Sequence, residues 1–417
     1  MSVREIWLGK LDAEERNTLL ASFSGWMLDG MDVMVYSFVL PELIVLWHIS
    51  RGQAGWLGTS ALLLSSVGGW GAGLAADRWG RVRILQITIV WFAFFTFLSG
   101  FTSSMTQLAV VRGLQGLGFG GEWAVGSVLI GERVRGEFRG RAVGTTQAGW
   151  AVGWGVAAVF YTLLFRFVPA HYAWRAMFWI GILPAFLVFW IQRHVHEPEL
   201  SQRTCREGFR AEDLLRIFRP PLLHTTALAS LVALGAQGGY YAVTTFLPLY
   251  LNLRGLSVTS TGWYLLVVIA GSLAGYLTSA HLADRIGRRG ALVLFAAGSF
   301  AAIALYMFVP FGSFGRLAMG FPLGFFPSGA FSPMGSFFTE LFPTALRGSG
   351  QGFSYNFGRA VGALFPTLVG YFSARLGLGW AIGLFAASAY ALMAGAVLAL
   401  PETRNRNLAE IAIGDGS

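Results

Sequence analysis

The sequence predicts an all-α membrane protein in which twelve membrane-spanning helices form two pseudo-symmetric six-helix bundles. Three observations support this fold class: a very apolar composition, a regular series of apolar stretches, and signatures that recur in both halves. The 417 residues are 55% hydrophobic and 12% charged, with a mean hydropathy of +0.58. An average soluble domain contains about 25% charged residues, so this composition excludes a soluble protein.

A membrane-spanning helix needs about 20 predominantly apolar residues, and short polar turns divide the chain into stretches of that length. The first bundle, 19–192, is expected to contain helices at about 19–46, 54–76, 84–104, 107–131, 142–165 and 174–192. The second bundle, 221–400, is expected to contain helices at about 222–250, 262–283, 290–310, 315–338, 349–374 and 378–400.

Polar segments precede, join and follow the two bundles. Residues 1–18 form an arm in which Asp12 and Glu15 have the spacing of a capping box, so we expect a short helix at the cytoplasmic surface. Residues 193–220 are expected to be a cytoplasmic linker with a short helix at Ala211–Phe218, and residues 401–417 a cytoplasmic tail. The polar, mixed-charge arm does not have the pattern of a cleavable signal peptide.

Basic residues predict the orientation of the chain. Most of its 30 lysines and arginines fall in the two termini and in the loops after even-numbered helices, which the positive-inside rule places in the cytoplasm. We therefore expect a multi-pass protein of the inner (plasma) membrane with both termini cytoplasmic. Because these residues lie in short loops between apolar stretches, they do not indicate a nucleic-acid partner. The basic residues expected on the outer side are Arg51, Arg166, Arg175, Arg254 and Arg375.

Two signatures recur in the second half of the chain. Asp77 and Asp284 belong to the pattern Gly/Ala-x3-Asp-Arg-x-Gly-Arg and stand 207 positions apart, and Glu132 and Glu340 open the pattern Glu-x6-Arg-Gly and stand 208 positions apart. Such similar offsets indicate duplication of a six-helix unit. We expect these loops to form an inter-helix charge network that stabilises one gating state, without contacting a solute. Their residues are Gly73, Asp77, Arg78, Gly80, Arg81, Glu132 and Arg139 in the first half, and Asp284, Arg285, Gly287, Arg288, Glu340 and Arg347 in the second.

The Asp-Arg loops resemble the signature of the major facilitator superfamily, and Arg112-Gly-Leu-Gln-Gly-Leu-Gly-Phe-Gly-Gly-Glu122 resembles its arginine-plus-glycine motif. A narrower set of motifs is similar to the proton symporters for carboxylates, the sialate and lactate group, with the aromatic-acid group a near relative. The resemblance covers residues 19 to 404 and implies alternating-access transport of a small solute by a monomer in the lipid bilayer. The narrower motifs are Leu28-Asp29-Gly30-Met31-Asp32, Gly121-Glu122, Trp174-Arg175-x2-Phe178-x-Ile180-Gly181-x2-Pro184 and Tyr355-Asn356-x-Gly358-Arg359.

Buried acids are the candidates for proton coupling, because a charge in a membrane span costs about 2.5–3.5 kcal/mol on insertion scales. Asp29 and Asp32 lie three positions apart and therefore on one helix face, where burial and proximity favour binding of a proton. The alternative is that they only pair with an arginine. At 1.5 Å per residue, Asp32 and Arg112 both lie roughly 20 Å from the cytoplasmic side, which predicts that they pair. Glu122 lies roughly 15 Å deeper along the helix than Arg112. We expect it to be either a second proton site or a partner of polar groups in the second or fifth helix.

Arg359 is the main candidate for substrate binding. It lies near mid-membrane, where substrate sites of such folds occur, and its planar guanidinium suits a carboxylate. Asn356, one turn earlier, shares its face. The alternative is an arginine neutralised by a helix-end carbonyl or a buried acid, and aromatic residues in spans more often serve packing than ligand binding. The weaker candidates are Gln237, Tyr240, Tyr241 and Ser328.

Other functional classes lack their signatures. A nucleotide-driven pump would need a phosphate-binding Gly-x4-Gly-Lys-Ser/Thr loop, and an enzyme would need a cluster of nucleophile, base or metal-ligand side chains. A receptor would usually carry an added soluble domain. The only pair of closely spaced histidines is His194 and His196, and Cys205 is the single cysteine, so we expect no cofactor and no metal. Proton-coupled symport of a small organic anion is the expected function, with sugar or drug transport as the alternative.

The predicted topology can be tested with Cys205, which lies in the segment expected to face the cytoplasm. A thiol reagent that cannot cross membranes should modify Cys205 in inverted vesicles, because only they expose the cytoplasmic side. Modification from the outside of intact cells would show that the orientation is wrong.

Overall fold

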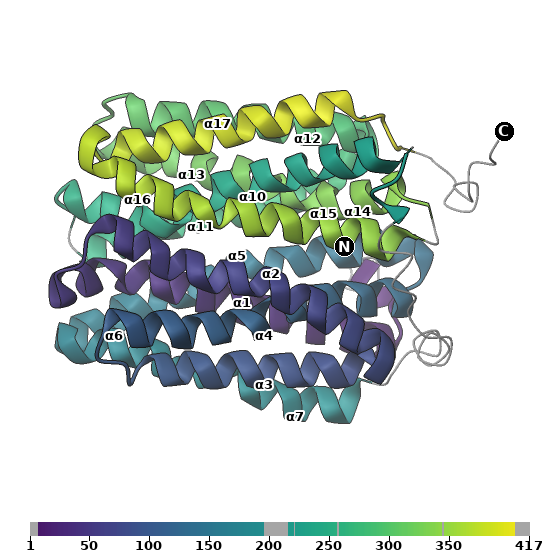
Figure 1. Ribbon diagram of the computed structural model, residues 1–417, viewed down its shortest axis with the longest axis horizontal. Helices are drawn as coiled ribbons and strands as arrows, with labels where there is room; N and C mark the ends of the chain where they lie inside the picture. Colours follow the sequence, from purple (N-terminus) through teal and green to yellow (C-terminus); the bar gives the residue numbers. More distant parts are fainter. Residues whose placement is uncertain (1–6, 196–215, 221, 257, 344–345, 405–417) are drawn as a thin grey trace. The chain divides into compact units, whose positions relative to one another are not determined.

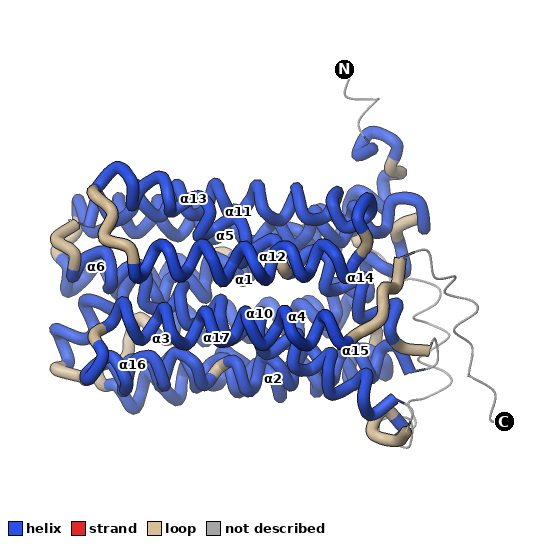
Figure 2. The backbone as a smooth tube through the Cα atoms, turned by 90° about the horizontal axis from the view of Figure 1, so that it is seen from above, coloured by secondary structure: helices blue, strands red, loops and turns tan. Residues whose placement is uncertain are grey.

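The computed structural model describes residues 7–195, 216–220, 222–256, 258–343 and 346–404. Every regular element in these ranges is a helix, and Figure 2 shows no strand in them. The helices make the twelve passes that the sequence predicts, and Figure 1 follows them along the chain from purple to yellow. Cys205 and most of the expected linker, including the start of the helix expected at Ala211–Phe218, lie outside the described residues.

The first five passes are single helices, and the sixth is divided. It contains α6, the 3₁₀ turn η2 and α7, whereas the sequence predicts one helix at 174–192. The break is caused by Pro184. Proline lacks a backbone N–H, and its ring clashes with the carbonyl four residues earlier, which lies where α6 gives way to η2. The elements are α1 (Ala13–Trp47), α2 (Arg51–Trp79), α3 (Arg81–Ser99), α4 (Met105–Arg133), α5 (Gly136–Phe167), α6 (Ala170–Trp179), η2 (Ile180–Ile182) and α7 (Pro184–His194).

Two of the last six passes are interrupted in the same way. The tenth pass breaks after Gly329 and the eleventh after Gly362, each four residues before a proline, Pro333 and Pro366. The expected continuous helices at 315–338 and 349–374 are therefore pairs of shorter helices. The elements are α10 (Leu222–Leu253), α11 (Val258–Ile286), α12 (Arg288–Phe308), α13 (Ser313–Gly329), α14 (Phe331–Leu341), α15 (Arg347–Gly362), α16 (Leu364–Leu376) and α17 (Leu378–Ala399).

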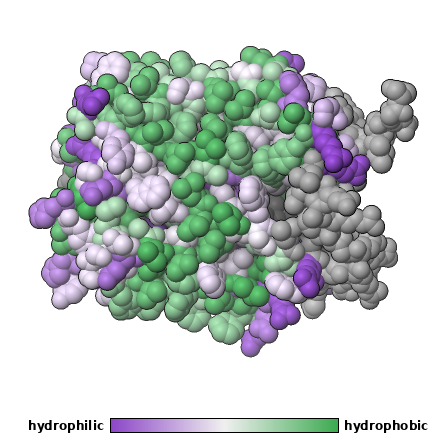
Figure 3. All heavy atoms as spheres, in the orientation of Figure 1, coloured by the Kyte–Doolittle hydropathy of each residue, from purple (hydrophilic) through white to green (hydrophobic). Residues whose placement is uncertain are grey.

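The surface of these helices is apolar. Large side chains such as Phe314 and Phe167 are 82% and 74% exposed, and in Figure 3 apolar side chains cover the helix lengths while hydrophilic ones gather near helix ends. Exposed apolar area on this scale marks a surface that contacts lipid. Among the described residues, seven helical stretches are long and apolar enough to cross a membrane: Ala13–Trp47, Arg81–Ser99, Arg141–Phe167, Ala170–His194, Ser260–Ala283, Arg288–Phe308 and Leu378–Ala399.

The amino-terminal arm differs from its prediction. The Asp12 N–H donates to Glu15 Oε2 at 3.0 Å and the Glu15 N–H donates to Asp12 Oδ1 at 2.7 Å, so this capping box begins the long helix α1 itself. A 3₁₀ turn, η1 (Trp7–Lys10), precedes it. Arg135 donates through Nε and its second terminal nitrogen to the two Glu15 oxygens, each at 2.8 Å. This bidentate pair holds the start of α1 against the α4–α5 turn.

Contacts within the chain divide it into two compact units. Unit 1 comprises Met1–Val35 and Leu64–Phe209, and unit 2 comprises Tyr36–Leu63 and Arg210–Ser417. The division falls inside α1 and α2, so the hairpin formed by the end of α1 and the start of α2 belongs to the unit that contains α10 to α17. The limits of the two six-helix bundles, 19–192 and 221–400, stay a prediction from the sequence.

Within unit 2, this hairpin is joined to α16 by small residues and hydroxyl groups. The Thr59 hydroxyl donates to the Ala363 carbonyl and lies 2.8 Å from Thr367 Oγ1. A side chain at Gly55 would overlap the Pro366 carbonyl, so glycine there permits the two backbones to approach. The hairpin and α16 thus form a close contact that depends on the absence of side chains.

The contact between Thr59 and Thr367 predicts that cysteines introduced at these two positions will form a disulfide. In a Cys205→Ser background, Thr59→Cys combined with Thr367→Cys should form an intramolecular bond on mild oxidation, because the two side-chain oxygens lie 2.8 Å apart and disulfides require close approach of the Cβ atoms. Altered gel mobility that reverts on reduction is the readout. The control pairs Thr59→Cys with Ser373→Cys, since Ser373 bonds within its own helix, and it should not cross-link. Equal cross-linking of both pairs would contradict the contact.

Candidate functional site

Asp32 lies in a buried polar cluster of unit 1. Its side chain is 1% exposed, and the Gln115 amide on α4 donates to its Oδ2. Thr96 on α3 lies beside the carboxylate, and Arg112 lies close enough for its charge to act on it. The Arg112 guanidinium carbon is also 5.9 Å from the centroid of the Phe178 ring. The structure therefore brings Asp32 and Arg112 close to each other.

The second acid on this face of α1, Asp29, forms a separate cluster. It is 1% exposed and Glu122 on α4 is 3% exposed, and the two carboxyl groups lie close to each other. The Glu122 head lies against Gly25, where any side chain would overlap its Oε1. Sequence reasoning considered polar groups of the second or fifth helix for Glu122, but the partner that the structure gives it is on α1.

Arg359 lies on α15 in the interior of unit 2 and is 1% exposed. Its Nε is 3.4 Å from Gln237 Oε1 on α10, and its guanidinium carbon is 5.0 Å from the centroid of the Tyr355 ring. The Tyr241 hydroxyl, also on α10, bonds to Arg359 and lies 3.4 Å from Gln237 Oε1. The Gln237 side-chain nitrogen donates to the Tyr355 carbonyl at 2.9 Å. Neutral polar and aromatic groups from two helices therefore contact this cation.

The remaining candidates for substrate binding make contacts within or between helices. The Asn356 side chain donates to the Gly352 carbonyl of its own helix at 3.0 Å. Ser328 shares a hydrogen bond with Ser272 on α11, and the Tyr240 ring meets Phe331 edge to face at 5.5 Å. For Tyr240, this ring contact is of the packing kind that the sequence left open as an alternative for aromatic residues.

Sequence reasoning missed three residues that complete the clusters: Gln115 and Thr96 beside Asp32, and Tyr355 beside Arg359. Gln115 lies three positions after Arg112 and so on the same face of α4. A polar amide inside an apolar span was the available signal. Thr96 had no comparable signal, because threonine hydroxyls in helices commonly bond to the preceding turn, as Thr96 does to the Phe92 carbonyl.

The recurring loops share one backbone feature. Gly80 and Gly287 stand at equivalent places in the repeated signature, directly before α3 and α12, and have φ of 97° and 93°. These positive values are readily available only to glycine. The same local geometry at the same offset supports the duplication inferred from sequence.

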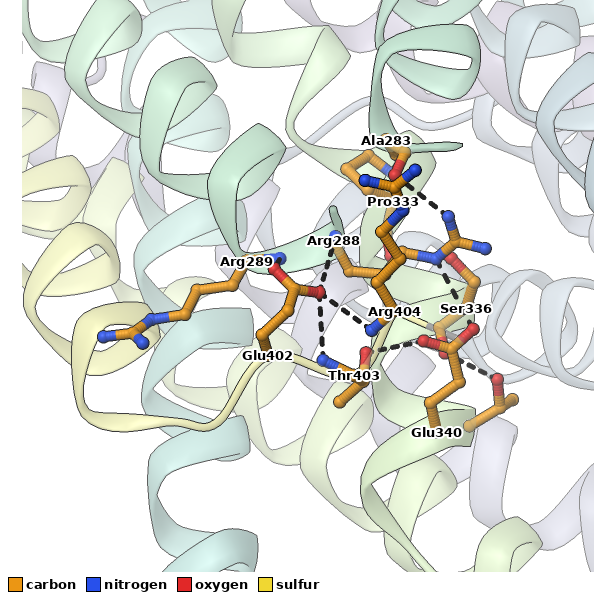
Figure 4. Close-up of polar contacts among 10 residues, drawn as sticks. Ala283, Arg288, Arg289, Pro333, Ser336, Glu340, Glu402, Thr403 and Arg404 are labelled. Atoms are coloured by element: carbon orange, nitrogen blue, oxygen red, sulfur yellow. Dashed lines mark hydrogen bonds and ion pairs between the residues drawn. The ribbon is translucent and has the colours of Figure 1, made fainter. Parts of the chain in front are cut away.

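The second of these loops joins a charge network, shown in Figure 4. Arg288 Nε is 3.4 Å from Glu340 Oε1, which links the two signatures of the second half. The Thr403 hydroxyl also donates to Glu340. The Glu402 carboxylate accepts the backbone N–H groups of Arg288 at 2.9 Å and Arg289 at 3.1 Å. Burial raises the pKa of Glu402, but backbone N–H groups, those of Arg404 and Arg288 first, outweigh it and hold the pKa below its ordinary value.

Fewer contacts are defined for the other loop residues. Arg81 is buried, the Arg78 guanidinium carbon is 5.9 Å from the Trp79 ring centroid, and Arg285 is exposed. Gly73 has open space around it. Five predicted side chains lie outside the described part of the chain: Asp77, Glu132, Arg139, Asp284 and Arg347.

The chemistry available at these sites is binding of a proton and binding of an anion. Within the described residues, no group of three or more His, Cys, Asp or Glu side chains is arranged to hold a metal ion. Buried carboxyl groups can take up and release a proton, and a buried guanidinium can bind a carboxylate through two parallel hydrogen bonds.

Comparisons with known proteins agree with this arrangement. A probable 4-methylmuconolactone transporter of Cupriavidus pinatubonensis is 40% identical over 409 residues, which cover 98% of this chain and 96% of that protein. The sialic acid transporter of Escherichia coli is 29% identical over 375 residues, which cover 89% of this chain and 91% of that protein. The inward-open structure of the E. coli xylose transporter superposes with a TM-score of 0.75 at 18% identity and covers 94% of this chain and 98% of that one, which shows a common fold.

The Major Facilitator Superfamily model matches residues 22–366, a range that includes both clusters of buried acids, Arg359 and both recurring signatures. With the twelve passes and the full-length relatives, this match places the chain among proteins that move small solutes across membranes and are not enzymes. The chain belongs to the Major Facilitator Superfamily of transporters.

Proposed function

We propose that this transporter carries a small organic anion together with protons, by alternating access. The observation that carries the proposal is the Arg359 guanidinium, held 1% exposed in the interior of unit 2. Desolvation of a cation is strongly unfavourable, and the neighbours Gln237, Tyr241 and Tyr355 are neutral. A carboxylate on the solute would supply a charge that matches the planar fork of arginine.

The names of two relatives support an anionic solute, since they specify 4-methylmuconolactone and sialic acid. The class we propose is therefore a monocarboxylate, a sialate or an aromatic acid. A second candidate is an uncharged solute such as a sugar, for which Gln237 and Tyr241 supply suitable neutral hydrogen-bonding groups. The two candidates differ in whether Arg359 must contact the solute.

Proton coupling is supported by the cluster around Asp32. When ionised, Asp32 attracts Arg112 and accepts a hydrogen bond from Gln115. Protonation removes the negative charge and weakens the hold on Arg112, which gives the proton a means to change the stability of one conformation. In this proposal the protein works as a monomer in the inner membrane with both termini cytoplasmic.

Transport in proteoliposomes tests the proposal. Purified protein should accumulate at least one acid from a panel of lactate, pyruvate, sialate, shikimate and benzoate when an inward proton gradient is imposed. Asp32→Asn should abolish this accumulation and retain downhill exchange, because a permanently neutral side chain cannot cycle a charge. Glu42→Gln on the same helix is the matched control and should behave as the parent does. Accumulation by Asp32→Asn against a gradient would show that Asp32 is not the coupling group.

The anion site is tested by substitution of Arg359. Arg359→Lys should weaken the apparent affinity for the transported acid strongly and Arg359→Ala should abolish uptake, because loss of a buried charge-assisted contact costs roughly 2–5 kcal/mol. Arg375→Lys, at an exposed position in the same pass, is the control and should leave affinity unchanged. Thermal stability of each variant in detergent separates binding from folding. Unchanged affinity in a well-folded Arg359→Ala protein would favour the uncharged solute.

A further inference from the structure

We infer that each transport cycle carries two protons, one on Asp32 and a second shared between Asp29 and Glu122. This inference rests on the proposed proton-coupled transport of an anion and adds its stoichiometry. It assigns the Asp29–Glu122 pair a task separate from that of Asp32.

The first support is the close approach of the Asp29 and Glu122 carboxyl groups, which lie within reach of a hydrogen bond. An ionised carboxylate only accepts hydrogen bonds, so two ionised groups have no hydrogen to share. No N–H or O–H group in the described part of the chain donates to either Glu122 oxygen. A proton on one of the two heads would supply the missing hydrogen and remove the repulsion between two negative charges.

The second support is the fit of the Glu122 head against α1. Gly25 lies one turn before Asp29, and a side chain there would overlap Glu122 Oε1. Glycine thus leaves room on α1 for a carboxyl group from α4 beside Asp29.

The third support is the balance of buried charge. Glu15 and Arg81 lie at helix ends, and the other buried charged residues in the described part of unit 1 are Asp29, Asp32, Arg112 and Glu122. Arg112 interacts with Asp32, and Asp29 and Glu122 lie beside each other. Two adjacent carboxylates in an apolar interior cannot both stay ionised without strong repulsion. Uptake of one proton converts the pair into a singly charged, hydrogen-bonded unit.

The two proton sites are separate in their partners. Asp32 accepts a hydrogen bond from Gln115 and lies near Arg112, whereas Glu122 lies beside Asp29. Asp29 and Asp32 differ by about 4.5 Å in height along α1. In each cycle one O–H bond forms on Asp32 and one on the pair, and both protons leave on the opposite side of the membrane.

Two protons and one monovalent anion carry a net charge of +1, whereas one proton and one anion carry none. Uptake of a monocarboxylate should therefore respond to an inside-negative membrane potential even without a pH gradient. A potential of about 100 mV can change the accumulation of one net charge by up to about 50-fold. Membrane potential is thus the variable that separates the two stoichiometries.

The experiment uses radiolabelled lactate and benzoate in proteoliposomes, with a potassium gradient and valinomycin to set the potential. The parent protein should show potential-driven uptake, and Glu122→Gln should show uptake that depends on the pH gradient alone. Asp29→Asn is the second variant, in case Glu122→Gln does not fold. Glu42→Gln should remain potential-dependent. Parent uptake that follows the pH gradient but ignores the potential would overturn the two-proton inference while leaving the proposed function intact.

A second measurement does not depend on transport. Infrared spectra of the purified protein should contain the C=O band of a protonated carboxyl group that Glu122→Gln removes and Asp32→Asn retains, and that disappears as pH is raised. A band that persists at all accessible pH values would identify a permanently protonated structural pair and refute a shuttled second proton. Absence of a Glu122-dependent band would refute the shared proton itself. No uptake of any acid, in contrast, would refute the proposed function.

Discussion

The constraint on which this structure depends is the absence of water in the hydrocarbon core of a membrane. Backbone groups there must bond within the chain, which restricts the passes to helices, and charged side chains must find polar surroundings inside the protein. The described chain follows both rules. Its surface is apolar along the helices, and its buried charges lie in clusters: Asp32 near Arg112, Asp29 with Glu122, and Arg359 among Gln237, Tyr241 and Tyr355.

Glycine and proline decide how these clusters form. Gly25 leaves room for the Glu122 head beside α1, and Gly55 lets the α1–α2 hairpin approach α16. Three prolines divide passes that hydropathy alone would leave continuous, because each removes a backbone donor and disturbs the carbonyl four residues before it. One of these breaks follows Gly362, less than one turn after Arg359, so the candidate anion-binding residue lies close to a break in its helix.

Duplication has preserved the loops and changed the interior. Gly80 and Gly287 keep the same positive φ at an offset of 207 residues, which shows that the loop geometry is retained in both halves. The buried charges differ: in the described residues, unit 1 holds Asp29, Asp32 and Glu122 with Arg112, besides Glu15 and Arg81 at helix ends, and unit 2 holds Arg359. In the proposed function this divergence assigns proton binding to one unit and anion binding to the other. A repeated scaffold can support this division because fold and site chemistry are set by different residues.

Composition, apolar length and repeated motifs were enough to predict twelve passes, the repeated loops and the proximity of Asp32 to Arg112, because hydropathy and helical rise act along one chain segment at a time. Tertiary structure decided the properties that depend on lateral neighbours. It paired Glu122 with Asp29, added Gln115 and Thr96 to the Asp32 cluster, and grouped Tyr36–Leu63 with unit 2. The Asn356 side chain donates a hydrogen bond within its own helix, although Asn356 shares a helix face with Arg359. Spacing gives the height of a residue on its helix, but the rotation of that helix and the choice of neighbour follow from close packing of all passes together.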